Sequence, residues 1–459
     1  MTAEVLDADY LIVGSGAMGM AFADTLLSET NASIVMFDRH HRPGGHWNDA
    51  YPFVRLHQPS AFYGVNSTPL GSDLKDRVGW NEGLYELASG AEVLAYFDHV
   101  MQRRFLPSGR VRYFPRCEWL GAGRFASIPS AREFEVRARK IVDATYMRVS
   151  VPSTRPPQYA LAPGVRCVPL NELPRCERPA SGYVVVGAGK TGMDACLWLL
   201  ASGVDADEIT WIVPRDSWLL DRASIQPHDF FGRSVLGGAK QLEAIAGAAS
   251  VDELFARVNA AGVLLRLDEN VRPSMYRCAT VTDAEAAQLR RIRNVVRLGR
   301  VTRIDAREIV LERGTLASDP QRLYVDCSAD ALARLPVAPV FAGERITLQT
   351  VRACQQVFSA AFIAHVEAAY ADEASKNALC TVVPHPNSDI DFLRVTLAGA
   401  RNDARWAQDA QLSAWLAGAR LNLFGPPPAV PDAALLEATQ RIAACAPAAI
   451  ATLERLLAQ

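Results

Sequence analysis

One pattern occurs twice in this sequence and constrains its fold more than any other feature. A short apolar run, Tyr10-Leu-Ile-Val13 in the first copy and Tyr183-Val-Val-Val186 in the second, leads straight into a Gly-x-Gly-x-x-Gly turn. A helix-like stretch and a second apolar run follow, and that run covers residues 33–37 or residues 209–213. This order of elements is typical of a dinucleotide-binding βαβ unit. The pattern predicts an α/β fold with two Rossmann-like units.

The two copies also end alike. Residues 134–145 and residues 308–328 each contain an alternating run and then an apolar segment that closes on an aspartate, Asp143 or Asp326. The copies are offset by a similar number of positions at their first glycines and at these aspartates. Two copies of one topology indicate two related cofactor-binding units.

The first glycine motif, Gly14-Ser-Gly16-Ala-Met-Gly19, allows the backbone to approach a pyrophosphate at a helix N-terminus. Asp38 closes the next strand, where a carboxylate receives ribose hydroxyls, and a glycine pair follows it. A glycine turn without a ligand is the alternative, and Trp47 could equally pack in the core. The predicted cofactor contacts of this copy are Gly14, Gly16, Gly19, Asp38, Arg39, Gly44, Gly45, Trp47 and Thr145.

The second motif contains Gly-Lys-Thr, so a triphosphate-binding P-loop has to be considered. That loop needs a glycine where Val184 stands, and this spacing excludes it. Arg215, after the second strand, favours NADPH over NADH because a guanidinium pairs with a 2′-phosphate; a solvated arginine beside Asp216 is the alternative. The predicted contacts of this copy are Gly187, Gly189, Lys190, Thr191, Gly192, Arg215, Arg222 and Asp326.

Charge and cysteine content narrow the possible partners. The 48 basic and 50 acidic residues give a net charge of −2, which provides no reason to expect nucleic acid or a membrane surface as partner. The nine cysteines contain no Cys-x-x-Cys, so neither a metal site nor a local redox dithiol is predicted. Scattered cysteines and acidic residues before the first apolar run favour the cytoplasm.

Several motifs in order resemble the flavin-containing monooxygenases and their class B relatives, over roughly residues 8 to 330. They are Gly44-Gly45-His46-Trp47, Tyr51-Pro-Phe-Val-Arg-Leu56, Val111-Arg-Tyr-Phe114, Ala144-Thr145 and Arg215-Asp-Ser-Trp218-Leu-Leu-Asp-Arg222. The resemblance implies FAD in the first unit and NADPH in the second. In that family NADPH reduces the flavin, molecular oxygen gives a C4a-hydroperoxide, and one oxygen atom passes to an amine, a sulfide or a ketone. Related enzymes are often dimers, so a homodimer is an assembly that the resemblance allows.

The repeat and the proline-rich passage set the expected domain bounds, and the resemblance adds the cofactor of each unit. Residues 1–150 form the first part of the FAD-binding domain, and the proline-rich residues 151–180 cross to the next domain. Residues 181–320 form the NADPH-binding domain. Residues 321–459 return a strand to the FAD domain and continue as a helical portion that folds back on it.

The sequence departs from the family near the reacting groups. Of the family's linker signature only Gly164 remains, and the family's active-site asparagine falls at His57. We therefore expect the reacting face to include His46, His57, Gln58 and Asn66, with a histidine that can transfer protons near neutral pH. An ordinary structural role is the alternative for each of them. Arg352, His365, His385, Asp389 and Asp391 could face a pocket or the surface.

The predicted function is monooxygenation of a small or medium organic substrate. A reductase, dehydrogenase or oxidase that does not stabilise the hydroperoxide is the first alternative, and the altered residues favour it. A non-catalytic protein that keeps the fold as a binding scaffold is the second. A disulfide reductase is disfavoured because no Cys-x-x-Cys follows the first unit.

Overall fold

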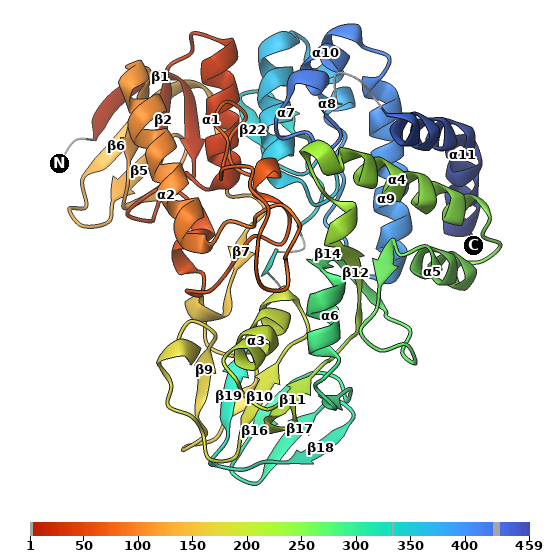
Figure 1. The fold of residues 1–459 in the computed structure, drawn as a ribbon. Coiled ribbons are helices and arrows are strands. Elements are labelled where there is room, and N and C mark those ends of the chain that lie inside the picture. The colour runs from red at the N-terminus through yellow and green to blue at the C-terminus, as the bar shows by residue number, and fades with distance from the viewer. Residues whose placement is uncertain (1–2, 330, 333–334, 426–431) are drawn as a thin grey trace.

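The computed structural model describes residues 3–329, 331–332, 335–425 and 432–459. Its first sheet has the order β21-β22-β6-β1-β2-β3, and the neighbours from β22 to β3 are parallel. The strands are β1 (Glu4–Val13), β2 (Ile34–Phe37), β3 (Val111–Phe114), β6 (Glu133–Asp143), β21 (Phe341–Ala342) and β22 (Arg345–Thr347). Figure 1 shows this unit at the upper left, with helix α1 (Ala17–Glu29) directly after β1.

The second unit repeats the arrangement at the bottom of Figure 1. Its parallel sheet has the order β15-β11-β10-β19-β9. The elements are β9 (Cys167–Pro169), β10 (Tyr183–Val186), α3 (Lys190–Ala201), β11 (Ile209–Ile212), β15 (Asn294–Val296) and β19 (Leu323–Asp326). In the first sheet Val13 pairs with Asp143, and in the second Val186 pairs with Asp326. The predicted repeat is therefore present down to its closing aspartates.

The second unit is longer at both ends than the predicted residues 181–320. Strand β9 comes from the segment predicted as a crossing, and β19 comes from the segment assigned to the return. The strand that does return to the first sheet is β22. The predicted boundaries missed this because a two- to four-residue strand carries too little periodic signal to be assigned to a sheet.

A layer inside the second unit was not predicted. Residues 217–289 form a small sheet of order β13-β12-β14 with three helices. The elements are β12 (Ser217–Asp221), α4 (Phe231–Ala246), α5 (Val251–Ala260), β13 (Leu264–Leu265), β14 (Met275–Val281) and α6 (Asp283–Leu289). A further antiparallel sheet of order β18-β17-β16 lies beside the second unit and pairs with β8. These strands are β8 (Ala160–Leu161), β16 (Val301–Ile304), β17 (Glu308–Leu311) and β18 (Gly314–Ala317).

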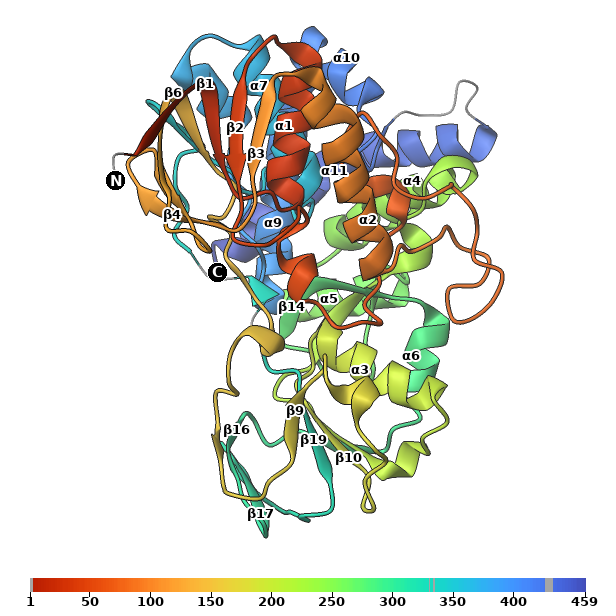
Figure 2. The same cartoon turned by 90° about the vertical axis from the view of Figure 1, so that its left-hand side faces the viewer.

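The C-terminal helices were predicted to fold back on the first unit, but only some of them do. Helix α7 (Gln356–Ala369) does pack on α1, and both are buried almost all round. Helix α11 (Ala433–Leu457) instead packs on α4 of the second unit's inserted layer, and Figure 1 shows the two side by side. The remaining helices are α8 (Glu373–Leu379), α9 (Asp389–Trp406) and α10 (Ala410–Gly418). The C-terminal portion therefore bridges both units, as the turned view in Figure 2 also shows.

Among the described residues, no helix is both long enough and apolar enough to cross a membrane.

Candidate cofactor-binding and active site

A single pocket of about 1990 Å³ extends over residues of the first unit, the second unit and the C-terminal portion. It is larger than the 300–1,000 Å³ that suits one drug-sized ligand, so it has room for more than one molecule. The first glycine loop and the second both contribute to its wall. Of the predicted residues, the wall includes Gly14, Gly16, Asp38, Arg39, Gly45, His46, Trp47, His57, Gln58, Thr145, Gly189, Lys190 and Thr191.

The first glycine loop leaves no room for a side chain at Gly14. Gly14 has φ +96, and a Cβ there would lie 2.7 Å from Thr145 Cγ2. Gly45 approaches the same loop, because its Cβ would lie 2.9 Å from Gly16 Cα. The Gly44 amide also donates to the Ser15 carbonyl at 2.9 Å. The glycine pair thus packs against the first loop while Gly45 lines the pocket, which combines the two roles considered for it.

Asp38 lies at the end of β2 with 5% of its surface exposed. Its Oδ2 accepts hydrogen bonds from Ser15 N at 2.6 Å and Ser15 Oγ at 3.1 Å. Its Oδ1 accepts from His40 N at 2.8 Å and is 2.9 Å from His40 Nδ1. Burial favours the neutral acid, but the hydrogen bonds from His40 and Ser15 outweigh it and lower the pKa of Asp38.

His40 joins two carboxylates and was not identified from the sequence. Its Nε2 lies 2.9 Å from Asp49 Oδ2, opposite the bond to Asp38. The hydrogen bond with Asp38 raises the pKa of His40, burial lowers it, and Asp49 raises it further, so the net shift is upward. No motif marks a histidine two positions after the ribose-binding carboxylate, and only the fold brings Asp49 to it.

The second glycine loop leaves more room. Gly187 has φ +125, and a Cβ there would lie 2.5 Å from Cys327 O. Gly187 is therefore confined in the same way as Gly14 in the first unit. At Gly189, in contrast, a Cβ would find no atom within 4 Å. Lys190, the next residue, forms an ion pair with Asp194, whose other oxygen accepts from Tyr51 Oη at 2.5 Å. The N-terminus of α3 therefore opens on free space beside a residue of the first unit.

His57 is held in the wall by a buried arginine. Arg222 is fully buried, and its Nε donates to the His57 carbonyl at 3.0 Å. The same guanidinium donates to Asn81 Oδ1, Thr280 O and Glu285 Oε2. Because it is saturated by protein acceptors and lies outside the pocket wall, the predicted dinucleotide contact of Arg222 is corrected to a role in positioning His57.

Two histidines of the wall, His46 and His57, are neutral at physiological pH. Burial, with the charges of Lys190 and Arg222, lowers the pKa of His57 to about 3. Burial likewise lowers the pKa of His46 to about 4. At these pKa values the two imidazoles are not protonated near neutral pH, which speaks against the predicted proton transfer by them. Among the described residues, His57 Nδ1 is a buried atom without a hydrogen-bond partner, so it is available to a ligand.

Of the other residues predicted near the reaction, Gln58 and Trp47 line the pocket and Asn66 does not. Trp47 is 8% exposed, lines the pocket and donates from Nε1 to Tyr63 Oη at 2.7 Å, so it serves the core and the wall together. Asn66 lies outside the wall, where its Oδ1 accepts from Leu421 N at 3.3 Å, and its predicted place at the reaction is corrected. The chain has turned away there, with a bridge between residues 65 and 68.

Other predicted contacts shape the loops without reaching the pocket. Gly19 and Gly192 lie against backbone carbonyls. A Cβ at Gly19 would lie 2.1 Å from Gly14 O, and a Cβ at Gly192 would lie 2.1 Å from Gly187 O. Asp326 is 1% exposed and accepts from Ser328 N at 3.1 Å, so it fixes the turn after β19. Gly44 also lies outside the wall.

Arg215 lies outside the pocket wall and reaches toward another part of the chain. Its guanidinium donates to Asn387 Oδ1 at 3.0 Å, and Arg277 donates to the same oxygen, also at 3.0 Å. Asp216, the residue considered as its partner, instead forms two hydrogen bonds with Arg297, at 2.9 and 3.1 Å. Of the polar residues left open, Arg352 and His385 line the pocket, while His365 pairs with Glu29 at 2.7 Å. Asp389 pairs with Arg272, and Asp391 caps α9.

Comparisons with known proteins agree with this architecture. A family model described as an NAD(P)-binding Rossmann-like domain matches residues 12–65. The closed crystal structure of cyclohexanone monooxygenase aligns with 96% of this chain and 98% of its own, at 14% identity and a TM-score of 0.50. A structure of cyclohexanone monooxygenase bound to ε-caprolactone aligns with 79% of this chain and 86% of its own, at 13% identity and a TM-score of 0.50.

The fold matches that of cyclohexanone monooxygenase, which confirms the predicted α/β fold with two Rossmann-like units and the resemblance in fold. Two mycobacterial proteins are much more similar in sequence. Uncharacterized protein Rv2000 of Mycobacterium tuberculosis (strain ATCC 25618 / H37Rv) and Uncharacterized protein Mb2023 of Mycobacterium bovis are each 56% identical over 423 residues, which cover 92% of this chain and 79% of theirs. The chain belongs to one family with these proteins.

Proposed function

We propose that the protein is an FAD-dependent oxidoreductase that takes its electrons from NADPH. The observation that carries this proposal is that two glycine-lined helix N-termini, those of α1 and α3, open on the same pocket. A helix N-terminus presents unpaired N–H groups and a positive dipole end to a pyrophosphate. Two such sites on one pocket support two dinucleotides whose reactive rings meet between the units.

The first unit fits FAD. Its pyrophosphate would lie against Gly16, and its ribose near Asp38. Both oxygens of Asp38 already accept two hydrogen bonds each, so a ribose hydroxyl would replace the bond from His40 Nδ1. Trp119 lines the same end of the pocket and stacks on Phe37 at 5.8 Å, which supplies an aromatic surface for an adenine.

The second unit fits NADPH. The open space at Gly189 accommodates a pyrophosphate, and Lys190 and Thr191 line the pocket beside it. The preference for NADPH over NADH rests on Arg215, which shares an acceptor with Arg277. Two guanidinium groups that converge on one oxygen atom could also donate charge-assisted hydrogen bonds to a 2′-phosphate.

We further propose that the protein transfers one oxygen atom from molecular oxygen to a small or medium organic substrate. FAD when bound supplies the two-electron carrier and the reaction with oxygen. The chain's own contribution is to orient the two cofactors, to exclude water and to present polar groups to the reacting rings. Tyr51 lines the pocket and donates a hydrogen bond to Asp194. Burial, with the charge of Asp194, raises the pKa of Tyr51 well above its usual value, so the Tyr51 hydroxyl stays a neutral donor.

A reductase or oxidase is the second candidate, and one specific observation favours it. His57 stands where the resemblance places an asparagine, and its half-buried imidazole is neutral, with a buried Nδ1 free of protein partners. A neutral imidazole carries its donor and its acceptor on two ring nitrogens that point in different directions, so Nδ1 offers only one of them, whereas an amide presents both at one end of the side chain. The loss of one of these two roles at that position distinguishes this wall from the family pattern.

One experiment decides between these functions. The protein is purified with its flavin, NADPH is added without oxygen, and bleaching of the flavin spectrum is followed. Isotopically labelled oxygen is then admitted together with panels of amines, sulfides and ketones. A labelled product supports monooxygenation, whereas NADPH use that gives only hydrogen peroxide supports the oxidase. A flavin that NADPH cannot bleach would remove both proposals and favour a binding scaffold.

Seven of the nine cysteines are free thiols, as is usual in a reducing compartment, while Cys278 and Cys354 form a disulfide; we propose the cytoplasm as the location. A homodimer remains a proposal drawn from the resemblance alone.

A further inference from the structure

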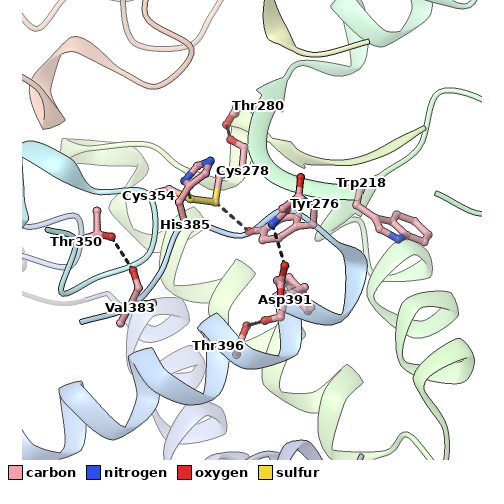
Figure 3. The surroundings of a disulfide bond; sticks show 12 residues. Trp218, Tyr276, Cys278, Thr280, Thr350, Cys354, Val383, His385, Asp391 and Thr396 are labelled. Carbon is pink, nitrogen blue, oxygen red and sulfur yellow. Dashed lines mark hydrogen bonds between the residues drawn. A yellow bond between two sulfur atoms is a disulfide. The ribbon is translucent and has the colours of Figure 1, made fainter. Parts of the chain in front are cut away.

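A disulfide joins two parts of the pocket wall that are far apart in the sequence. Cys278 and Cys354 are 76 positions apart, and their Cα atoms are 6.5 Å apart. Cys278 belongs to β14 in the second unit's inserted layer, and Cys354 lies between β22 and α7 of the first unit. Figure 3 shows the bond among side chains of both parts. The disulfide is therefore a covalent link between the two cofactor-binding units.

Both cysteines occupy a backbone region that favours glycine. Cys278 has φ 56 and Cys354 has φ 59. Strand β14 also leaves its register with β12 at this point, between Trp218 and Leu220. Non-glycine residues in the left-handed region persist only where their surroundings enforce that conformation. The covalent bond is part of what enforces it here, so opening the bond allows both residues to relax.

The two sulfur atoms differ in access. Both residues line the pocket, so solutes in the pocket reach the bond. Cys278 is 7% exposed, whereas Cys354 is only partly buried. An incoming thiolate therefore meets Cys354 Sγ first, and Cys278 Sγ is the leaving atom.

Two neighbours of the leaving sulfur, Arg277 and Tyr276, favour a thiolate there. Arg277 is next to Cys278 and lines the pocket. Burial and the charge of Arg277 lower the pKa of His385 to about 4, and His385 Nδ1 lies 3.9 Å from Cys354 Sγ. Burial, the larger of these two causes, disfavours an anionic sulfur as well, whereas the charge of Arg277 favours it. Tyr276 Oη, which burial keeps protonated by raising its pKa, lies 3.6 Å from Cys278 Sγ and can donate to it.

We propose that Cys278–Cys354 is a thiol–disulfide exchange site at which a low-molecular-weight thiol reversibly opens the link between the two units. A thiolate attacks Cys354 Sγ, its sulfur bonds to Cys354, and the bond to Cys278 breaks with Cys278 leaving as a thiolate. A second thiol then attacks the mixed disulfide, releases the disulfide of the small thiol, and leaves Cys354 reduced. Two small thiols are oxidised and one protein disulfide is reduced, so electrons and protons balance.

The opened protein keeps its fold because other contacts hold each side. Thr350 and Val383 exchange two hydrogen bonds, at 2.8 and 2.6 Å, beside Cys354. Tyr276 packs edge-on against Phe392 of α9, with ring centroids 5.1 Å apart. Opening the bond therefore loosens β14 and residues 351–355 locally, and the same contacts bring the thiols back together for reoxidation. The exchange requires no flavin and does not rest on the proposed function.

The experiment counts thiols in the native protein. Alkylation after denaturation labels seven cysteines in the linked form and nine in the open form. The purified full-length protein is incubated with excess reduced glutathione without denaturant, and then with oxidised glutathione. We expect a shift from seven labels to nine and back, with faster hydrogen exchange in residues 275–281 and 351–355 of the open form. Seven labels that persist until denaturant is added would make the bond purely structural and overturn the proposal.

Variants test the direction of attack and the role of charge. Cys278→Ser leaves Cys354 as a free thiol, and Cys354→Ser leaves Cys278 as a free thiol. Because Cys354 is more accessible, we expect Cys354 to form a mixed disulfide with oxidised glutathione faster than Cys278 does. Arg277→Gln slows reduction of the native bond several-fold because it raises the pKa of the leaving thiol. Arg272→Gln is the matched control, since Arg272 forms ion pairs with Asp252 and Asp389 outside the pocket wall. If nine cysteines are still labelled after oxidised glutathione has been added, the bond does not form again and the proposal is also overturned.

Discussion

A side chain at Gly189 separates cofactor binding from folding. Gly189 is the N-cap of α3, with φ −75 and ψ −178, which any residue adopts, and a Cβ there meets no atom within 4 Å. Gly189→Ala therefore costs less than about 1 kcal/mol of folding free energy, because the weaker cap is offset by a less flexible unfolded chain. The methyl group nevertheless occupies the space where a pyrophosphate would approach the helix.

The expected loss of NADPH affinity follows from the bonds that this approach makes. A hydrogen bond to a charged group is worth about 1.5–3 kcal/mol. Losing one to the pyrophosphate weakens NADPH binding roughly 10- to 150-fold. The dissociation constant is measured by titration of NADPH fluorescence, the folding free energy by urea denaturation, and bound FAD by absorbance. FAD content stays unchanged because the first glycine loop is intact.

Two other glycines serve as matched controls. Gly192→Ala places a Cβ 2.1 Å from Gly187 O, so it destabilises the protein by about 3 kcal/mol or more. Gly232→Ala on α4 meets no atom within 4 Å and lies outside the pocket wall, so it leaves NADPH affinity unchanged. If Gly189→Ala binds NADPH as tightly as the unmodified protein, the N-terminus of α3 does not hold the pyrophosphate and the proposed second site is refuted.

Three further predictions concern charged groups. Arg215→Gln lowers the preference for NADPH over NADH by roughly 10-fold or more, measured as the ratio of the two kcat/KM values. Arg222→Met destabilises the protein by about 3–5 kcal/mol in urea denaturation, because it leaves Glu285 without its buried partner. The pKa of His40 is raised in the folded protein, so its stabilising contribution is complete below about pH 6.5 and is lost as pH rises through the folded pKa. His40→Asn removes that pH dependence from the free energy of unfolding while Asp38 keeps its bonds to Ser15.

Each of these predictions has a clear contrary result. An unchanged coenzyme ratio in Arg215→Gln would assign selectivity to other residues. A fully stable Arg222→Met protein would mean that the buried ion pair contributes nothing net. If His40→Asn retains the same slope of stability against pH between about pH 6 and pH 8, another group is responsible for it.

The sequence determined the two cofactor-binding units because their signals are local. The spacing of Gly14, Gly16 and Gly19, the apolar run before them and Asp38 after them fix one turn and its neighbours. The second copy repeats these constraints, and strands β1 and β10 pair with closing strands in the same register at Asp143 and Asp326. Turn geometry and strand periodicity depend on residues close in the chain, so the sequence alone was sufficient for them.

Only the tertiary structure decided which polar groups meet. His40 with Asp49, Arg222 with His57, and Cys278 with Cys354 are each pairs whose partners no motif identifies. Burial then set their chemistry, since the same imidazole is a proton carrier in water and a neutral group in the pocket wall. The packing of α11 on α4 was equally beyond local reasoning, because an amphipathic helix records that it has an apolar face but not which surface covers it. The sequence thus determined the two glycine-loop units, and long-range packing decided what surrounds the space between them.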